Sequence, residues 1–429
     1  MARWVQKVKS LLPRGNESST ATEEKTTGKL KSLNQRTSLT QFTYDTLLPQ
    51  RRQIRLIQVW RGSSYQCSSL GDDEFGCTIH TFDHHEAPHY IALSYTWGKP
   101  NPSRLILVNG KLCCVRENLY NFLNTFSKPQ TAEERDYLWI DQICIDQSDV
   151  GERNHQVGMM ADIYRNCDFV ITWLDASASK GADSIRDGWV FDQLQHPEVN
   201  MERIAYKCVN KFLKNRYFTR LWIVQEVLLA PEVLILCANI WLEWNDVKKA
   251  ILSVQAHWFD RLPDAKFLFT RREQNYGPGR FRMREDFPVY LTLYSSMGCV
   301  DPRDKVYGLL GLAGTEQRDF VVDYNKPVQE VLFDVVQFVT FRETSKYSTE
   351  FIEAGAKAIC KNMRLPKDDT TALNNLFDDV VQVPFISQWG YHRSTRDSAY
   401  CWWYELDGIR FYYFRDGRFL DMPKSFSTR

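Results

Sequence analysis

Several features that would assign this chain to a common class are missing from its 429 residues. Its 11 cysteines include no Cys-x-x-Cys pair, so we expect reduced thiols and no disulfide framework. No apolar run approaches the ~20 residues that a membrane-spanning helix needs, and the N-terminus lacks an apolar signal segment. The formal net charge is only +1, which gives no electrostatic footprint for nucleic acid. These absences predict a cytoplasmic protein with no integral membrane segment and no nucleic acid partner.

The common motifs for nucleotide hydrolysis, serine catalysis and metal binding are also missing. The chain has no G-x-x-x-x-G-K-[S/T] sequence and no G-x-S-x-G sequence. Four histidines are concentrated in what looks like one short loop before a strand: His80, His84, His85 and His89. Such a loop does not provide the separated ligand pairs that structural zinc sites use. We therefore predict no metal site and no bound cofactor.

The composition nevertheless predicts a folded protein with a large core. Hydrophobic residues make up 43% of the chain and aromatic residues 14%, which is ample for a globular domain. The exception is the start of the chain, where residues 15–40 are rich in Ser, Thr, Lys and Glu and poor in large apolar groups. Such a segment buries too little apolar surface to offset the entropy of ordering. We expect a disordered leader over residues 1–43.

From residue 44 onward, short apolar runs alternate with helical patterns. The apolar runs, which predict strands, are Ile54–Val59, Tyr90–Tyr95, Tyr137–Asp141, Phe169–Leu174 and Val233–Cys237. The helical patterns are Glu117–Phe126, the stretch that follows the capping-box-like pair Asp149 and Glu152, Ile204–Leu213 and Leu221–Leu229. Strands separated by helices of this length predict an α/β fold, with a parallel sheet and helices on both faces.

Three further segments complete the predicted organisation. Asn109-Gly110 lies between two short apolar runs and predicts a β-hairpin inserted into the domain, since both residues tolerate positive φ. Residues 241–340 predict a mainly helical extension of the core, which spans residues 44–240. In the last segment, residues 341–429, the stretch Cys401–Leu420 alternates aromatic and polar residues. It predicts a small antiparallel meander.

Several sequence blocks carry a resemblance to a known family. They are Tyr44–Leu48, Ile54–Ile57, Ala92–Gly98 (ALSYTWG), Leu138–Gln147 (LWIDQICIDQ), Arg220–Glu226 (RLWIVQE) and Asp301–Leu312. In this order and spacing the chain resembles the heterokaryon-incompatibility (HET) domain of filamentous fungi over about residues 47–340, with its core at about 90–240. The resemblance implies a relative of the Toll/interleukin-receptor (TIR) domain, with a flavodoxin-like parallel sheet. It also implies a role in fungal self/non-self recognition and programmed cell death.

Glu226 is the catalytic residue that the resemblance implies. It follows Trp222 by four residues, similar to the Trp-Cys-x-x-Glu element of catalytic TIR domains, although Ile223 stands in place of the cysteine. A carboxylate can stabilise the oxocarbenium-like centre that forms when the nicotinamide–ribose bond of NAD breaks. The Trp222 ring offers an aromatic face for the nicotinamide, so NAD is the implied substrate. The alternative is structural: Trp222 belongs to the core, and Glu226 lies in an exposed turn or pairs with Arg220.

Three more residues are predicted to bind the substrate. Tyr95 and Trp97 follow one strand and Asp141 ends the next, and ligands of open parallel sheets lie at the carboxyl ends of strands. The alternative for the two aromatic residues is packing. For Asp141 it is a capping role or an ion pair, with Arg153 as a candidate partner, because an unpaired buried carboxylate is costly.

Two functions therefore remain open. In the first, the domain is an NAD glycohydrolase that becomes active when it self-associates or meets a trigger. In the second, it is a non-enzymatic adaptor that signals cell death by self-association. Both predict a homo-oligomer on activation and a protein trigger that the sequence does not identify.

Overall fold

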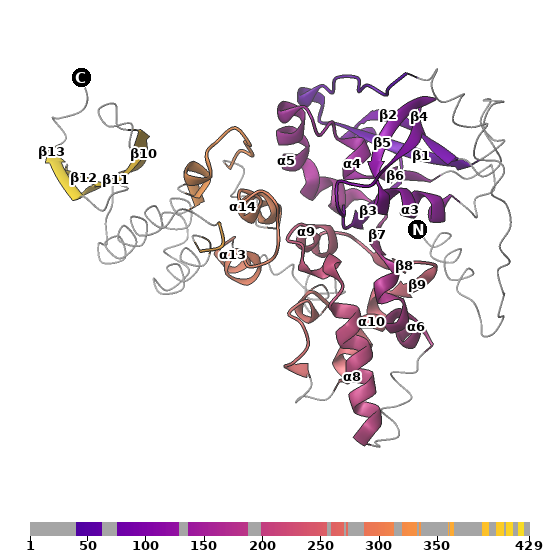
Figure 1. Ribbon diagram of the computed structural model, residues 1–429. Helices are drawn as coiled ribbons and strands as arrows, with labels where there is room; N and C mark the ends of the chain where they lie inside the picture. The colour runs from indigo at the N-terminus through magenta and orange to yellow at the C-terminus, as the bar shows by residue number, and fades with distance from the viewer. Residues whose placement is uncertain are drawn as a thin grey trace. The chain divides into compact units, whose positions relative to one another are not determined.

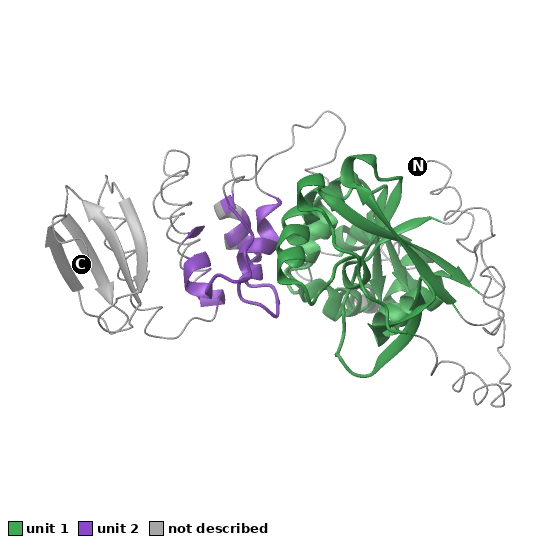
Figure 2. Ribbon diagram, turned by 90° about the horizontal axis from the view of Figure 1, so that it is seen from above, with its two compact units in different colours: residues 1–283 green, residues 284–429 purple. Residues whose placement is uncertain are grey.

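The computed structural model describes residues 40–61, 75–127, 136–187, 199–254, 259–269, 287–312 and 320–332, together with four later strands and a few single positions. The chain divides into two compact units, residues 1–283 and residues 284–429, which are coloured separately in Figure 2. Most of the predicted leader lies outside the described residues. Within the described part of the chain, no helix is long and apolar enough to cross a membrane.

The first unit is built on a nine-stranded mixed sheet (Figure 1). Its strand order is β5-β4-β2-β1-β6-β3-β7-β8-β9. The strands are β1 (Gln53–Arg61), β2 (Phe75–Asp83), β3 (Tyr90–Tyr95), β4 (Ser103–Val108), β5 (Lys111–Arg116), β6 (Tyr137–Trp139), β7 (Phe169–Leu174), β8 (Val233–Cys237) and β9 (Ile240–Glu243). The neighbours β6, β3, β7 and β8 are parallel to one another. Counted along the chain from β3, their order is second-first-third-fourth, as in flavodoxin-like sheets.

The parallel core forms where the sequence is apolar without interruption. Every residue of β3, β7 and β8 is buried, and each of these strands has the bounds that its apolar run predicts. Strands covered on both faces need such runs, because neither face of the strand meets water. The α/β prediction is confirmed.

Antiparallel strands extend the parallel core on both sides. β1 runs antiparallel to both β2 and β6, and β9 runs antiparallel to β8. The predicted hairpin is β4–β5, and its turn has φ of 50° at Asn109 and 75° at Gly110. Positive φ at both central residues matches the twist of the flanking strands. The sheet is therefore mixed, and the segment with His80 belongs to strand β2 rather than to a loop.

The helices of the first unit lie between and beside these strands. They are α3 (Glu117–Phe126), α4 (Asp141–Cys144), α5 (Val150–Asn166), α6 (Ser179–Arg186), α8 (Val199–Leu213), α9 (Ile223–Leu228) and α10 (Trp244–Ser253). Figure 1 shows α6, α8 and α10 grouped near the β8–β9 end of the sheet. The predicted strand Tyr137–Asp141 is shorter than expected, because β6 ends at Trp139 and Asp141 begins helix α4.

Helix α5 begins at the predicted capping residue. Asp149 Oδ1 accepts a hydrogen bond from the Glu152 backbone N–H at 3.0 Å. The Glu152 carboxylate accepts the N–H of Asp146, just before the helix, and not that of Asp149 as in a full capping box. Its two oxygens also accept hydrogen bonds from Arg55 of β1 at 2.6 and 2.9 Å, with the two side chains 3% and 8% exposed. This buried ion pair ties α5 to the sheet.

The second unit contains helices α13 (Phe287–Tyr294) and α14 (Asp304–Leu310) and a separate four-stranded sheet. The strands of that sheet are β10 (Gln388–Arg393), β11 (Tyr400–Leu406), β12 (Ile409–Phe414) and β13 (Phe419–Pro423), in chain order. Every neighbouring pair is antiparallel, which confirms the predicted meander.

Candidate functional site

Three hydroxyl groups lie together near the carboxyl ends of the parallel core strands. Ser94 of β3 and Thr172 of β7 are register partners on neighbouring parallel strands. The hydroxyl of Tyr217, from the short 3-10 helix Arg216–Thr219, lies 2.6 Å from Ser94 Oγ and 3.1 Å from Thr172 Oγ1. All three residues are at most 1% exposed. Buried hydroxyls need partners, and here they supply partners to one another.

Glu226 completes this group. It lies in α9, a six-residue helix in which every residue is buried, and is itself 2% exposed. Ser94 Oγ donates a hydrogen bond to Glu226 Oε2, and Arg220 Nη2 lies 3.6 Å from Glu226 Oε1. The predicted alternative of an exposed turn is therefore wrong for Glu226. Its alternative pairing with Arg220 is present, at a separation longer than a direct hydrogen bond.

Asp141 lies in the same electrostatic environment. Its carboxylate accepts hydrogen bonds from Trp97 Nε1 at 2.7 Å and from the Gln142 backbone N–H at 2.8 Å. The Tyr95 hydroxyl, on a side chain with 1% exposure, lies 3.4 Å from Gln142 Oε1. Arg220 acts on Asp141 as well as on Glu226, since burial raises the pKa of both carboxyls and the Arg220 charge opposes that rise.

Helix α3 and the end of β5 hold the loop that carries Trp97. The Arg116 guanidinium carbon lies 4.9 Å from the centroid of the Trp97 ring, and Arg116 Nη1 donates to the Gly98 carbonyl at 2.8 Å. Asn118 Nδ2 donates to the Thr96 carbonyl at 2.5 Å. Gly98 has φ of 77°, which a residue with a Cβ rarely adopts. The loop is thus fixed in a shape that directs the Trp97 N–H to Asp141.

The cluster contains two carboxyl groups and one guanidinium group. Burial raises the pKa of Glu226, against the opposing effects of the Arg220 charge and the Ser94 hydrogen bond. Burial also raises the pKa of Asp141, against the effects of Arg220 and of the hydrogen bond from Trp97. Buried carboxyls with raised pKa values are concentrated in active sites, because catalysis needs such tuned groups.

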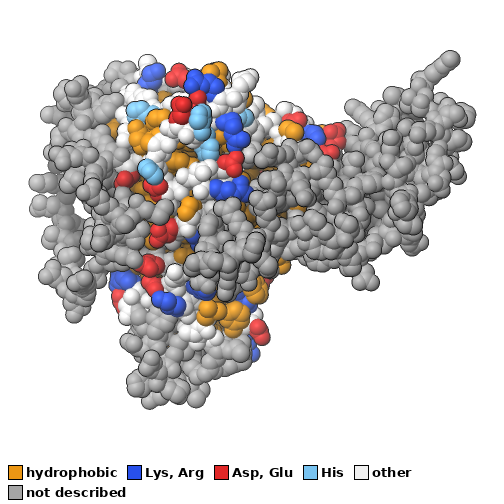
Figure 3. All heavy atoms as spheres, turned by 180° about the vertical axis from the view of Figure 1, so that it is seen from behind, with side chains coloured by type: hydrophobic (Ala, Val, Ile, Leu, Met, Phe, Trp, Pro, Cys, Tyr) orange, Lys and Arg blue, Asp and Glu red, His pale blue; other side chains and the backbone are white. Residues whose placement is uncertain are grey.

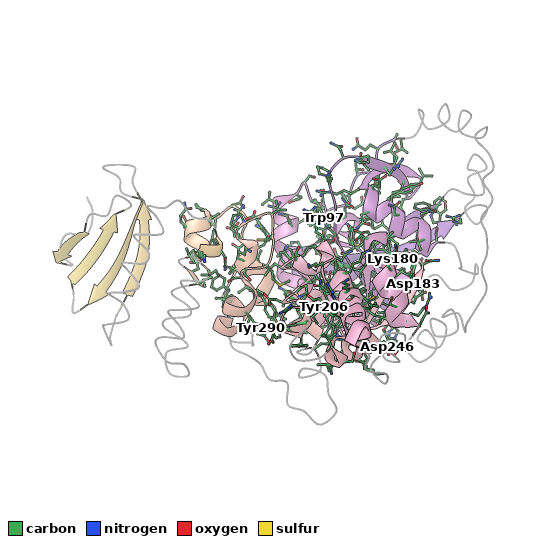
Figure 4. All side chains as sticks on the ribbon, turned by 60° about the horizontal axis from the view of Figure 1, so that its bottom comes forward. Trp97, Lys180, Asp183, Tyr206, Asp246 and Tyr290 are labelled. Atoms are coloured by element: carbon green, nitrogen blue, oxygen red, sulfur yellow. The ribbon has the colours of Figure 1, made fainter. Side chains whose placement is uncertain are left out.

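The structure brings most of the predicted site residues together. Trp97 contacts Asp141 directly, and Arg220 interacts electrostatically with both Asp141 and Glu226. Trp222 joins through its backbone, since its carbonyl accepts the Glu226 N–H at 3.3 Å. In Figure 4 the Trp97 side chain lies apart from Asp246 of α10, at a different part of the unit. The predicted residues therefore lie at one edge of the sheet. Their roles in catalysis and substrate binding stay predictions.

None of the three hydroxyl residues was predicted from the sequence. The signal was a single Ser or Thr near the end of each of two otherwise apolar or aromatic strands, Tyr90–Tyr95 and Phe169–Leu174. A Ser or Thr is unusual in a run that is buried on both faces, because its hydroxyl then requires an internal partner. Tyr217 carried no comparable signal, since tyrosines occur throughout the chain.

The surface around the described residues carries charges of both signs. Figure 3 shows Lys and Arg side chains interspersed with Asp, Glu and His side chains on the face that it displays. Within the described ranges, no group of three or more His, Cys, Asp and Glu side chains is placed to hold a metal ion. The cluster of Glu226, Asp141 and Arg220 is the candidate functional site.

Residues 90–226 match the family described as "Heterokaryon incompatibility protein (HET)". The chain is also similar to "Heterokaryon incompatibility protein 6, OR allele" of Neurospora crassa, with 28% identity over 343 aligned positions. This alignment covers 64% of the chain and 49% of that protein, so the chain spans about half the length of the curated relative. No solved structure matches the chain.

The family match begins at the first residue of β3 and ends at Glu226. It therefore contains Ser94, Asp141, Thr172 and Tyr217 as well as the glutamate. The buried cluster lies within the matched segment. Residues 90–226 are thus the part of the chain that is similar to the heterokaryon-incompatibility (HET) family.

Proposed function

We propose that this protein acts in fungal heterokaryon incompatibility and that its HET domain hydrolyses NAD in the cytosol, with Glu226 as the catalytic carboxylate. The name of the similar Neurospora crassa protein, a heterokaryon incompatibility protein, supports the biological role. The observation that carries the chemical part is the burial of Glu226 beside a second carboxyl group and a single arginine. This cluster lies at the carboxyl ends of parallel strands, where ligands of such sheets bind.

The chemistry suits a buried carboxylate. When the nicotinamide–ribose bond breaks, its electron pair leaves with nicotinamide and positive charge develops at the anomeric carbon. A negative charge fixed in a site with little water stabilises that centre more than it would in bulk water. Water then adds to the same carbon and loses a proton, which gives ADP-ribose. The ionised form of Glu226 is the form that this step uses.

Access to Glu226 requires a local rearrangement, because its side chain is only 3% exposed. The contact with Arg220 is the weaker of the two that hold the carboxylate, at 3.6 Å, and Arg220 is itself 19% exposed. A closed resting site is what we expect of a cell-death enzyme that becomes active on self-association or on contact with a trigger. The same burial favours the second candidate function, an adaptor without enzymatic activity in which Glu226 serves packing alone.

Nicotinamide release from NAD distinguishes the two functions. Purified full-length chain is measured free and after clustering through a fused dimerisation tag, for the wild type, Glu226→Gln and Glu117→Gln. Glu117 is the matched control, because its side chain is 40% exposed and pairs with Arg104 at the surface. We expect the clustered wild type to release nicotinamide and Glu226→Gln to lose on the order of 100-fold or more of the rate, as when one electrostatic stabiliser is removed.

Glu117→Gln is expected to stay within about twofold of the wild type, since exposed pairs contribute little. A clustered wild type that releases no nicotinamide would favour the adaptor function. A Glu226→Gln variant as fast as an active wild type would exclude Glu226 as the catalytic carboxylate.

A further inference from the structure

Four buried side chains form a continuous hydrogen-bonded chain that ends on Glu226. Thr172 contacts the Tyr217 hydroxyl, that hydroxyl contacts Ser94, and Ser94 contacts Glu226 Oε2. Each of the four residues is at most 2% exposed. Because these side chains have almost no access to water, the hydroxyls depend on one another for their hydrogen bonds. Which group donates and which accepts in each bond is therefore set by the protein.

The charge of Glu226 fixes the direction of this chain. An ionised carboxylate only accepts, and a serine hydroxyl has one proton to donate. When Ser94 donates its hydrogen bond to Glu226, Tyr217 has to donate to Ser94, and Thr172 has to donate to Tyr217. When Glu226 is protonated on Oε2, the carboxyl group donates to Ser94 and every bond in the chain reverses. The direction of the chain and the charge of the carboxyl are therefore coupled.

The fold places Tyr217 where it can control this coupling. Ser94 and Thr172 are opposite each other on neighbouring parallel strands, so their side chains project from the same face of the sheet. The 3-10 helix Arg216–Thr219 brings one phenol hydroxyl to both of them, and Asn215 fixes the start of this helix by accepting the Tyr217 N–H at 2.9 Å. A phenol is a stronger acid than an aliphatic hydroxyl, so its hydrogen bond polarises the Ser94 O–H towards the carboxylate.

We propose that Tyr217 is a positioning residue that acts through Ser94 to hold Glu226 in its ionised, hydrogen-bond-accepting form. This inference rests on the proposed function, since it gives Tyr217 a part in NAD hydrolysis without contact with the substrate. Burial favours the neutral carboxyl, and the chain of donors opposes that tendency. Without the phenol hydroxyl, Ser94 donates more weakly and the carboxyl holds its proton up to a higher pH.

The test compares two variants and one control in the full chain. Tyr217→Phe keeps the ring and removes its hydroxyl, and Thr172→Val removes the last donor at nearly constant volume. The control is Tyr90→Phe, another tyrosine with only 3% exposure, whose hydroxyl donates to the Ile163 carbonyl at 2.6 Å and not to this chain. For each, the pH profiles of kcat and KM for nicotinamide release are measured. The protonation of Glu226 is followed separately by 13C NMR of glutamate carboxyl carbons, with Glu226→Gln to assign the signal.

For Tyr217→Phe we expect the acid limb of kcat and the NMR midpoint to move upward together by roughly half a pH unit, with KM unchanged. Thr172→Val moves both in the same direction by less, and Tyr90→Phe moves neither. A Tyr217→Phe or Thr172→Val protein that folds and titrates as the wild type does overturns the inference. If the wild type releases no nicotinamide, the proposed function fails, and the NMR titration still decides whether Tyr217 controls the charge of Glu226.

Discussion

Replacing Glu152 by alanine is predicted to destabilise the first unit severely. The substitution removes both oxygens that hold Arg55, whose side chain is 3% exposed and therefore has almost no access to water. It also removes the acceptor of the Asp146 backbone N–H, which Glu152 Oε1 holds at 2.6 Å. The two remaining acceptors of Arg55 are neutral, the Cys144 carbonyl at 3.1 Å and the Asp45 carbonyl at 2.5 Å.

The magnitude follows from the charge that is left behind. Breaking a buried ion pair by removing one partner costs about 3–5 kcal/mol, because the other charge stays buried without compensation. The lost hydrogen bond to Asp146 adds about 1 kcal/mol. We therefore expect Glu152→Ala to lower the free energy of unfolding by about 4–6 kcal/mol, a large part of the 5–15 kcal/mol that is typical of a folded domain.

Urea unfolding followed by far-UV circular dichroism measures this loss. Glu117→Ala is the control, since it breaks the Arg104–Glu117 pair, whose side chains are 53% and 40% exposed. Exposed pairs contribute less than about 1 kcal/mol. The double variant Arg55→Met with Glu152→Leu should recover much of the stability, because it removes both charges. A Glu152→Ala protein no less stable than Glu117→Ala would refute this reasoning.

Two further predictions concern packing and pH. Gly76→Ala should lower the free energy of unfolding in urea by about 1–3 kcal/mol, because a Cβ there overlaps the Trp60 ring and lies 2.8 Å from the Leu107 carbonyl oxygen. Gly158→Ala in helix α5 should instead raise it by about 0.5–1 kcal/mol, because a Cβ there meets nothing within 4 Å. Burial raises the pKa of Glu226 above 4.5, so between pH 4.5 and that higher pKa the unfolded chain loses a proton that the folded chain keeps, and stability falls as pH rises. Glu226→Gln lacks this pH-dependent loss of stability. Its free energy of unfolding relative to that of the wild type should therefore increase as the pH rises from 4.5. A difference that stays constant with pH would contradict the raised pKa of Glu226.

The sequence predicts the parallel core well but misses two of the strands that flank it, β2 and β9. Strands β3, β7 and β8 are apolar throughout and have the bounds predicted for them. Strand β2 was missed because histidine and threonine interrupt its apolar residues, and its outer half is partly exposed. Strand β9 was missed because its turn places Ala238 at φ of 54°, where a glycine or asparagine would have marked the reversal.

The site was predictable in its location but not in its contacts. The alternation of strands and helices predicts a parallel sheet, and in such a sheet Trp97 and Asp141, which follow their strands, lie at the carboxyl edge. The hydrogen bond from Ser94 to Glu226 depends on the register of two strands and on the path of the chain through helix α9. Neither is encoded in a local pattern, since both arise from packing between segments far apart in the chain.

The separation of those segments has a consequence for protein synthesis. Ser94 and Glu226 are 132 residues apart, and β7 and helix α8 lie between them in the chain. A nascent chain released up to β7 already has Ser94, Asp141 and Thr172, but it has no carboxylate at position 226 to complete the cluster. Because domains fold as units once their last element has emerged, an unfinished chain carries an incomplete site. Translation that stops before Glu226 therefore yields a fragment that lacks the proposed activity.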